Sequence, residues 1–497
     1  MDQQSFPKSV DILIVGGGPT GLGAATRLNQ LEAASWVLAE AEPSVGGLAS
    51  SDTTPEGFLF DMGGHVMFSH YEYFDDLLNS AVGPQWNVHE RVSFVWIKNR
   101  WIPYPLQNNL KDLPVDEQIA CINGLIDSLS IKDEPKDFDE WILKNTGKGI
   151  ADLFMRPYNC KVWACRPDTM QCKWLGERVS PVDVKIQIEN ILRNKSSTKW
   201  GPNATFRFPK FGGTGSVWKS VASLLPKEKI FCDKKLRGID FDRKIAKFSD
   251  GSVCMYNKMI LTAPLDICLT WAGFPQLASQ VKYSSTHVVG LGIRGANPHD
   301  KKCWMYFPED NCPFYRCTIF SLYSENNCPS DSQVLPTLRT AESLQPDSES
   351  LKCGSGPYWS IMFEISESKE RRPIDISSVV EETIQGAIRT LLIDPKSEIV
   401  SIFHRRLERG YPIPSLSRDS AVNEGLMFLK SKNVWSRGRF GAWKYEAGNQ
   451  DHSLMQGVEA VDNILFGHPE FTVENPDFVN GRRNCDIKYS TDKQSAN

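Results

Sequence analysis

The stretch VDILIVGGGPTG at residues 10–21 decides the fold. Its apolar run breaks into glycines at positions 16, 18 and 21, and residues 22–31 then follow a helical pattern. In a dinucleotide-binding fold such glycines permit a tight turn, admit a pyrophosphate to the backbone, and let the helix pack closely on the strand. The free N–H groups at the start of that helix attract phosphate. The stretch therefore predicts a Rossmann-like unit that binds a dinucleotide.

The residues around this motif strengthen the prediction, because a glycine motif alone is weak evidence. Residues 35–39 (SWVLA) have the pattern of a second strand, and Glu40 stands at its end, where an acid binds a ribose hydroxyl in this fold. A second match at residues 290–295 (GLGIRG) is followed by Pro298, which cannot open a long helix. We therefore expect residues 290–295 to form a glycine-tolerant strand and turn.

Composition is typical of a globular enzyme with two or three domains. The 497 residues exceed one compact core, and 41% of them are hydrophobic and 23% charged. The net charge of −4 argues against binding to nucleic acid, which needs a surplus of Lys and Arg. The thirteen cysteines are scattered and never spaced as CxxC, as in a reduced cytosolic protein. We expect a cytoplasmic protein without a metal site or a membrane partner, since no secretory pattern or long apolar run is present.

Periodicity divides the rest of the chain into helical and strand-like regions. Apolar residues recur at helical spacing in residues 118–129, 138–144, 150–155 and 182–192, which predicts an inserted helical domain. Strand-like segments at residues 229–232, 245–248, 259–262, 287–293, 315–322 and 359–365 predict a second, largely antiparallel sheet.

Turns and caps complete this picture. Residues 91–96 and 101–104 predict a hairpin that turns at residues 98–100, and residues 324–357 predict a long surface excursion. Late in the chain, residues 454–465 predict a helix that Asn449, Asp451 or Ser453 caps.

The order of these pieces resembles FAD proteins of the glutathione-reductase-like superfamily. The discriminating features are Gly46 and Gly47 beyond the ribose acid and the glycine-led helix near the C-terminus. In such folds the late helix directs its N-terminus toward the flavin, where its partial positive charge favours the anionic reduced form.

Longer strings resemble the eukaryotic UDP-galactopyranose mutase family more specifically, from about residue 10 to 482. In the first half these strings are DMGGHVMFSH at 61–70, LFMRPYN at 153–159, Trp163, LGERV at 175–179 and GPNATFRFP at 201–209. In the second half they are WMYFPEDNCPFYR at 304–316, GYP at 410–412 and WSRGRFGAWKYEAGN at 435–449.

This resemblance implies an isomerase that interconverts UDP-galactopyranose and UDP-galactofuranose, for galactofuranose-containing cell-wall and other glycoconjugates. In the family that the sequence resembles, NADPH first reduces FAD, and N5 of the reduced flavin attacks the anomeric carbon while UDP leaves. The covalent flavin–galactose adduct opens and recloses before UDP returns. Both UDP-sugars and UDP are thus the expected partners, and the oligomeric state stays open.

The resemblance also implies a division of the chain into three parts. We expect an α/β fold with a discontinuous Rossmann-like FAD-binding domain over residues 1–110, 205–280 and 400–497. An α-helical, uridine-binding domain over residues 111–204 and an antiparallel β-sheet domain over residues 281–399 complete the predicted architecture.

The expected cofactor contacts come from the glycine motif and from the matching strings. They are Gly16, Gly18, Pro19, Thr20, Gly21, Glu40, Gly47, Leu48, Gly63, Gly64, His65, Arg439, Gly448, Asn449, Gln450 and Ser453. His65 lies in the segment that resembles the loop facing the isoalloxazine ring, and we count it with the catalytic residues.

The expected substrate contacts fall into three groups. Arg178 and Arg316 match phosphate-contacting, catalytic arginines, whose guanidinium fork can bind two phosphate oxygens. Tyr323, Tyr411 and Tyr445 match tyrosines that reach the same pyrophosphate. Uridine contacts are expected from Tyr104, Gln107, Phe154, Tyr158, Asn159 and Trp163, and contacts on the galactose and flavin side from Phe68, Asn203, Trp304, Tyr306 and Asn449.

Two other functions stay open at this point. An amine-oxidase-like flavoprotein would take an uncharged substrate and gives no reason for two arginines at a diphosphate. A non-catalytic escort protein on the same fold would not need the intact glycine motif and Glu40.

Overall fold

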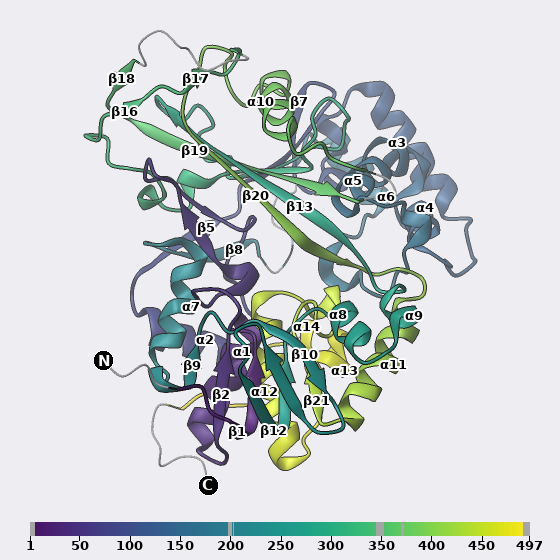
Figure 1. Ribbon diagram of the computed structural model, residues 1–497. Helices are drawn as coiled ribbons and strands as arrows, with labels where there is room; N and C mark the ends of the chain where they lie inside the picture. Colours follow the sequence, from purple (N-terminus) through teal and green to yellow (C-terminus); the bar gives the residue numbers. More distant parts are fainter. Residues whose placement is uncertain (1–4, 197–200, 202, 344–351, 369–371, 491–497) are drawn as a thin grey trace.

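Two sheets organise the protein, one below and one above in the view of Figure 1. The computed structural model describes residues 5–196, 201, 203–343, 352–368 and 372–490. The first sheet has the strand order β10-β11-β12-β1-β2-β9, with β21 beside β12. Its strands are β1 (Ser9–Val15), β2 (Trp36–Ala39), β9 (Ile230–Phe231), β10 (Leu236–Asp240), β11 (Ile245–Phe248), β12 (Val253–Leu261) and β21 (Val434–Ser436).

The centre of the first sheet is parallel and covered on both faces. β1 pairs in parallel with β2 and β12, and its apolar run is buried from Ile12 to Val15, as expected for a strand that packs on two sides. Ile12 and Ile14 face α1 (Pro19–Leu31) and α12 (Gln450–Phe466). Leu13 and Val15 face the opposite layer, which includes α8 (Leu265–Trp271) and α11 (Arg418–Ser431). The predicted Rossmann-like unit is confirmed.

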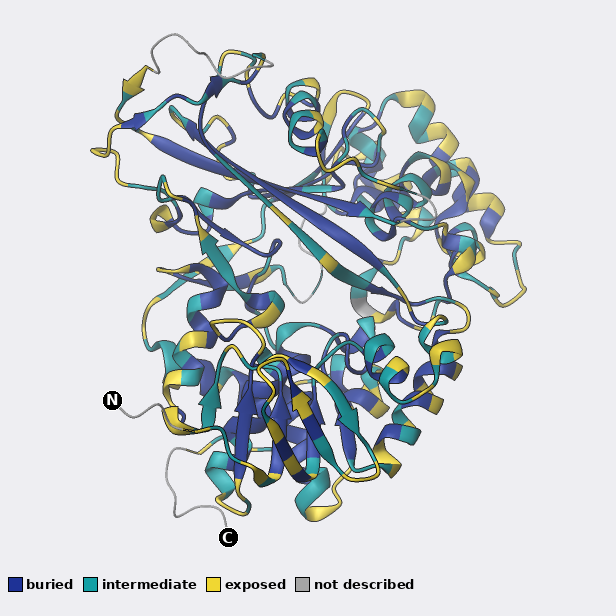
Figure 2. Cartoon of the chain, in the orientation of Figure 1, coloured by how far each residue is buried: buried dark blue, intermediate teal, exposed yellow. Residues whose placement is uncertain are grey.

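The second sheet has the strand order β17-β20-β13-β19-β15-β14-β6-β7. Its long central strand β13 (Lys282–Arg294) is antiparallel to β19 (Tyr358–Glu367) and β20 (Glu398–Ile413). Figure 2 shows β13 and β19 buried along nearly their whole length. The remaining strands are β6 (Ser93–Ile97), β7 (Arg100–Pro103), β14 (Trp304–Tyr306), β15 (Arg316–Ile319) and β17 (Arg339–Thr340).

The second glycine match therefore lies inside a strand, as expected. A methyl group on Gly290 would come within 2.6 Å of the Phe60 ring, and one on Gly292 within 2.6 Å of the Phe58 ring. These two glycines make room for aromatic rings that pack against the sheet, so they have no part in a phosphate-binding turn.

Sheet membership corrects part of the prediction from sequence. The segments 229–232, 245–248 and 259–262 form β9, β11 and β12 of the first sheet and do not belong to the second. Apolar periodicity identifies a strand but not its partner, so it could not assign these segments. Conversely, β6, β7 and β20 pair in the second sheet, although residues 1–110 and 400–497 were assigned to the nucleotide-binding region. The division into three domains stays a prediction.

The helices predicted for the insert are confirmed. The insert contains α3 (Val115–Ser128), α4 (Phe138–Ile150), a π-helical turn (Ala151–Met155), α5 (Arg156–Trp163) and α6 (Val184–Leu192), which lie beside the second sheet in Figure 1. The excursion at residues 324–357 contributes β17 and the small β16 (Leu335–Pro336) and β18 (Cys353–Gly354) pair, and its residues 344–351 lie outside the described part.

The hairpin of β6 and β7 is also confirmed. Lys98 and Asn99 both have positive φ, 52° and 57°, as the two-residue turns preferred in hairpins require. Within the described ranges, no helix combines the length and the apolar character that crossing a membrane demands.

We expect Gly290→Ala to destabilise the protein, because the new methyl group would overlap the Phe60 ring. Overpacking a filled core costs about 1–3 kcal/mol, measurable as the free energy of unfolding in urea. Gly238→Ala in β10 is the matched control, since nothing lies within 4 Å of its added methyl group. Alanine there should be neutral or stabilising by about 0.5–1 kcal/mol. Equal losses in both variants would contradict the packing explanation.

Candidate active site

A cavity of about 1000 Å³ lies between the elements of the two sheets and the helical insert. All of the residues predicted as cofactor or substrate contacts line it, except Gly21 and Tyr323. Residues that lie far apart in the sequence thus meet in one space. They come from, among others, the turn after β1, the segment after β4 (Leu59–Asp61), the helical insert, strands β14, β15 and β20, and the start of α12.

The turn after β1 forms one end of this cavity. Gly16 has φ 102°, and a side chain there would meet Thr262 Oγ1 at 1.9 Å. A methyl group on Gly18 would have its nearest neighbours at 3.9 Å, so this glycine leaves the backbone open to a ligand. Gly21 lies under the turn, where a methyl group would be 1.8 Å from the Gly16 carbonyl oxygen. Gly21 therefore serves helix–strand packing and does not reach the cavity.

Glu40 lies at the end of β2 on the cavity wall, as predicted. Its Oε2 accepts a hydrogen bond from Gly17 N–H and its Oε1 accepts one from Glu42 N–H at 2.8 Å. Burial raises the pKa of this carboxyl group, although the backbone donors work against the shift. The carboxylate thus ties the glycine turn to β2.

Two helix N-termini open into the cavity, those of α1 and α12. The helices cross at backbone contact, because a methyl group on Gly23 would be 2.3 Å from Leu454 O and one on Gly457 would be 2.0 Å from Thr20 O. Asn449 occupies the N-cap position of α12, but its side chain makes no capping hydrogen bond. Asp451 and Ser453 lie inside the helix, so of the three residues predicted as the cap Asn449 holds the N-cap position, without a side-chain hydrogen bond. In the first turn of α12 the His452 N–H donates to Asp451 Oδ1, whereas the N–H groups of Gln450 and Asp451 remain available to a ligand.

Glu364 on β19 organises the centre of the cavity, although the sequence prediction missed it. This carboxylate is 3% exposed and accepts hydrogen bonds from Gly64 N–H at 3.0 Å and the Tyr315 hydroxyl at 2.7 Å. Arg316 Nε and Nη2 donate to it at 2.8 and 2.6 Å. Burial raises the pKa of Glu364, but the Arg316 ion pair outweighs burial and holds the pKa below its usual value. A lone glutamate within the apolar run WSIMFEIS is the signal that could have found it.

This ion pair corrects the role expected for the Arg316 fork. The Nε–Nη2 edge is already taken by Glu364, so Arg316 cannot present that edge to two phosphate oxygens. The third nitrogen of this guanidinium, Nη1, makes no hydrogen bond to the described residues. It can therefore donate to a ligand. The guanidinium also lies over the Trp304 ring, 4.9 Å from its centroid.

Arg178 presents the clearest unsatisfied donor. Its Nη2 donates to the Glu446 carbonyl oxygen at 2.6 Å, whereas its buried Nη1 has no partner among the described residues. The guanidinium carbon lies 5.5 Å from the centroid of the Tyr445 ring. A buried cationic donor without a partner is costly, so an anionic ligand at this position would be stabilised.

Aromatic rings form the wall on the side of the helical insert. Tyr104 and Tyr306 have ring centroids 4.5 Å apart, and Phe154 stacks on Tyr158 at 5.3 Å. Trp163 contacts Tyr411 and Tyr445 edge-on at 5.6 and 4.8 Å. Such flat apolar surfaces suit a planar base.

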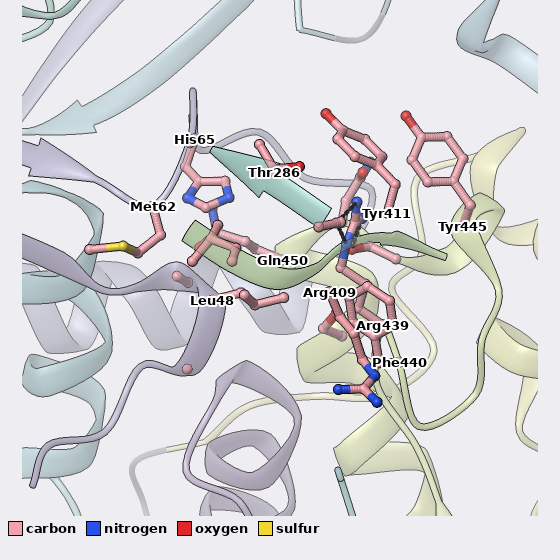
Figure 3. A pocket seen from close by; sticks show the side chains of 18 of the residues that line it. Leu48, Met62, His65, Thr286, Arg409, Tyr411, Arg439, Phe440, Tyr445 and Gln450 are labelled. Atoms are coloured by element: carbon pink, nitrogen blue, oxygen red, sulfur yellow. Dashed lines mark hydrogen bonds between the residues drawn. The ribbon is translucent and has the colours of Figure 1, made fainter. Parts of the chain in front are cut away.

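Figure 3 shows His65 on one side of the cavity and Tyr411 and Tyr445 on the other. Arg439 lies against both tyrosine rings and donates to the carbonyl oxygens of Gly410 and Gly448. It therefore joins β20 to the segment before α12, and its backbone contacts indicate a structural part in the pocket.

The side chain of Asn203 accepts a hydrogen bond from Arg91, a second cavity-lining residue that the prediction missed. Tyr323 is the exception among the expected substrate contacts. It is fully buried among Phe206, Phe208 and Phe320, and its hydroxyl has no partner in the described chain. The 3₁₀ turn at Phe320–Leu322 directs it into the core. The structure does not bring Tyr323 to the cavity.

Comparisons with known proteins agree with this geometry. The model of the NAD(P)-binding Rossmann-like domain matches residues 14–81. A reduced UDP-galactopyranose mutase of known structure is 43% identical, and it superposes with a TM-score of 0.88 over 96% of this chain and 98% of that chain. The chain belongs to the UDP-galactopyranose mutase family. As a member of this family it is an enzyme of the isomerase class, which confirms the resemblance seen in the sequence.

More distant structures share the fold alone. A CLA-producing fatty acid isomerase from P. acnes superposes with a TM-score of 0.59 at 13% identity, covering 93% of this chain and all of that chain. Wild-type putrescine oxidase bound to putrescine superposes with a TM-score of 0.57 at 12% identity, covering 92% and 99%. An amine-oxidase-like activity therefore has only a shared fold in its favour, whereas the mutase family match extends over almost the whole chain.

We expect Arg316→Ala to lower the free energy of unfolding by about 3–5 kcal/mol, because it leaves the Glu364 charge buried and unpaired. The double variant Arg316→Ala/Glu364→Gln removes that charge and should recover part of the loss in urea denaturation. Arg405→Ala, which removes an exposed side chain paired with the half-buried Asp52, is a control expected to lose about 0–1 kcal/mol. If Arg316→Ala lowered the free energy of unfolding no more than the control Arg405→Ala does, the stabilising role of the Arg316–Glu364 ion pair would be contradicted.

His65 should stay neutral through the physiological pH range. Burial lowers its pKa to about 4, with Glu364 opposing and Arg439 and Arg316 adding to the shift. Because an unfolded histidine binds its proton near pH 6.5, this group weakens the fold as the pH falls from about 6.5 toward 4. An NMR titration of labelled histidine, assigned with His65→Gln, measures the midpoint. A midpoint between about 6 and 7, near the ordinary histidine value, would show that the ring is solvated.

Proposed function

We propose that this protein interconverts UDP-galactopyranose and UDP-galactofuranose on a reduced FAD. The observation that carries the proposal is the 43% identity to a UDP-galactopyranose mutase over 96% of the chain. The cavity supports it, since one space joins a dinucleotide turn to a compartment lined by arginines and aromatic rings. A dinucleotide site alone would not require the second compartment.

The residues present fit FAD. The open backbone at Gly18 and the N-terminus of α1 suit its pyrophosphate, and Glu40 suits the adenosine ribose. The segment Gly63–His65 and the N-terminus of α12 would enclose the isoalloxazine ring. When bound and reduced, FAD would supply a nitrogen nucleophile that takes the place of UDP at the sugar carbon.

The chain's own residues would bind and orient the nucleotide sugar. Tyr104, Phe154 and Tyr158 offer faces on which uracil can stack, and Arg178 Nη1 offers a buried donor to the diphosphate. Negative charge grows on the diphosphate as it leaves, so a fixed cation binds the transition state more strongly than the ground state. Arg316 adds its Nη1 and its positive charge. His65, being neutral, adds no charge beside the flavin position.

The finer points of the proposal follow from the family resemblance. NADPH is the proposed reductant, and a cytoplasmic location and a part in galactofuranose-containing glycoconjugates are the proposed setting. The scattered cysteines, which are never spaced as CxxC, support that location.

Purified protein should bind FAD and, once reduced with dithionite or NADPH, convert UDP-galactofuranose into UDP-galactopyranose on chromatography. Arg178→Ala should lower kcat/KM about 10²–10³-fold, as expected for the loss of one donor to a developing anion, and should weaken UDP binding while the flavin spectrum stays unchanged. Arg193→Ala, on a largely exposed residue of the same helical insert, is the matched control. Reduced, flavin-loaded protein without conversion would overturn the proposed function.

A further inference from the structure

Two buried carboxylates hold the ends of the segment that carries His65 and Phe68. At one end Gly64 N–H donates to Glu364 on the second sheet at 3.0 Å. At the other end His70 N–H donates to Asp451 Oδ2 on α12 at 3.0 Å. Residues 64–70, here called the flavin-facing loop, thus span from the second sheet to a helix of the first.

Asp451 makes a compact clamp on His70. Its Oδ2 also lies 2.8 Å from His70 Nδ1, and its Oδ1 accepts the N–H of His452 at 2.8 Å. The side chain of Asp451 is fully buried. Burial raises the pKa of this carboxyl group, but His452 and His70 outweigh burial and hold it below the usual value. The group is therefore an anion that serves three N–H donors.

The same side chains are poorly arranged for a metal ion. Ligand atoms of His70, Asp451 and His452 lie within 4.8 Å of one another. The two imidazole rings are stacked, however, with centroids 5.1 Å apart and planes inclined by 25°. Nitrogen lone pairs lie in the ring plane, so those of stacked rings run side by side and do not converge on one ion about 2 Å away. Hydrogen bonding explains the cluster better than coordination does.

We propose that Asp451 is a positioning residue that fixes, through His70, the distance between the flavin-facing loop and the N-terminus of α12. This inference rests on the proposed function in one respect, namely that these two walls enclose the flavin. Gly64, His65 and Phe68 line the cavity from the loop, and Asn449 and Gln450 line it from the helix start immediately before Asp451.

The loop has further attachments besides the two carboxylates. The backbone N–H and the Nδ2 of Asn484 donate to the His70 carbonyl oxygen at 2.7 and 3.1 Å, and Arg483 Nη1 donates to the Ser69 carbonyl oxygen at 3.3 Å. Met67 and Arg207 exchange backbone hydrogen bonds of 3.0 and 2.8 Å, which hold the middle of the loop to β8 (Thr205–Pro209). None of these contacts, nor the Glu364 contact, ends on α12, so among these hydrogen bonds the Asp451 clamp is the one that joins the loop to that helix. The ring of Phe68 meets the ring of His70 edge-on at 6.0 Å, so a displaced His70 would move a residue of the cavity wall.

The test compares Asp451→Asn with Asp462→Asn by hydrogen–deuterium exchange of the intact protein. Asp462 lies on the same helix, is also buried, and pairs with Arg27 at 2.8 and 3.1 Å on the face toward α1. We expect amide exchange in residues 64–70 to rise roughly tenfold in Asp451→Asn, the change that corresponds to a loss of about 1.4 kcal/mol, and to stay unchanged in Asp462→Asn. His70→Ala keeps the backbone hydrogen bond to Asp451 and should give an intermediate rise in the exchange of the loop amides. This variant still tests the proposal if Asp451→Asn does not fold.

A second readout is the rate of FAD release from the oxidised protein, which should rise about tenfold in Asp451→Asn alone, as expected when a mutation weakens a binding wall. The proposed positioning role of Asp451 would be refuted if amide exchange in residues 64–70 stayed unchanged in both Asp451→Asn and His70→Ala. It would also be refuted if exchange in these residues rose as much in Asp462→Asn as in Asp451→Asn. Faster loop exchange with an unchanged FAD release rate would overturn the link to the flavin wall. Neither readout needs turnover, so a protein that holds FAD but fails to convert UDP-sugars would refute the proposed function and leave this result standing.

Discussion

Backbone contact between α1 and α12 is the constraint on which the site depends. Gly23 and Gly457 carry no side chain at the crossing, and a single methyl group at either would collide with a carbonyl oxygen of the other helix. The two helices can therefore start side by side, and their N-terminal partial positive charges meet in one cavity. A dinucleotide that spans both ends gains from both, so the close crossing sets the length of ligand that the pocket favours.

The second sheet completes the pocket by placing a buried ion pair at its centre. Glu364 neutralises part of Arg316, receives the flavin-facing loop and orders Tyr315, so one buried carboxylate holds three walls of the cavity. This arrangement leaves Arg178 as the cavity-lining arginine with a buried donor still unsatisfied among the described residues. The two arginines that looked equivalent in the sequence are thus unequal in the structure, and Arg178 is the better candidate for holding the leaving diphosphate.

Much of the fold could be predicted because local patterns carry it. The glycine turn, the helical insert and the Lys98–Asn99 hairpin each have a signal within a few residues. Which strands pair with one another could not be predicted, because the sequence patterns of β11 and β12 do not differ from those of β13 or β19. In the site, cavity-facing residues within long matching strings were found, whereas Glu364 and the Asp451 clamp were missed as functional groups. Their importance lies in contacts between residues 300 and 381 positions apart.

The order of strands in the first sheet also has a consequence for synthesis on the ribosome. β1 and α1 lie within the first 31 residues, but their neighbours include β12 and α12, which ends at Phe466. Because a ribosome adds about 5–20 residues per second, α12, which covers the inner face of α1, emerges on the order of tens of seconds after α1 itself. The nascent N-terminal unit must keep apolar surface from aggregating during that interval. Chains that terminate before α12 should therefore be recognised as unfinished and bound by chaperones.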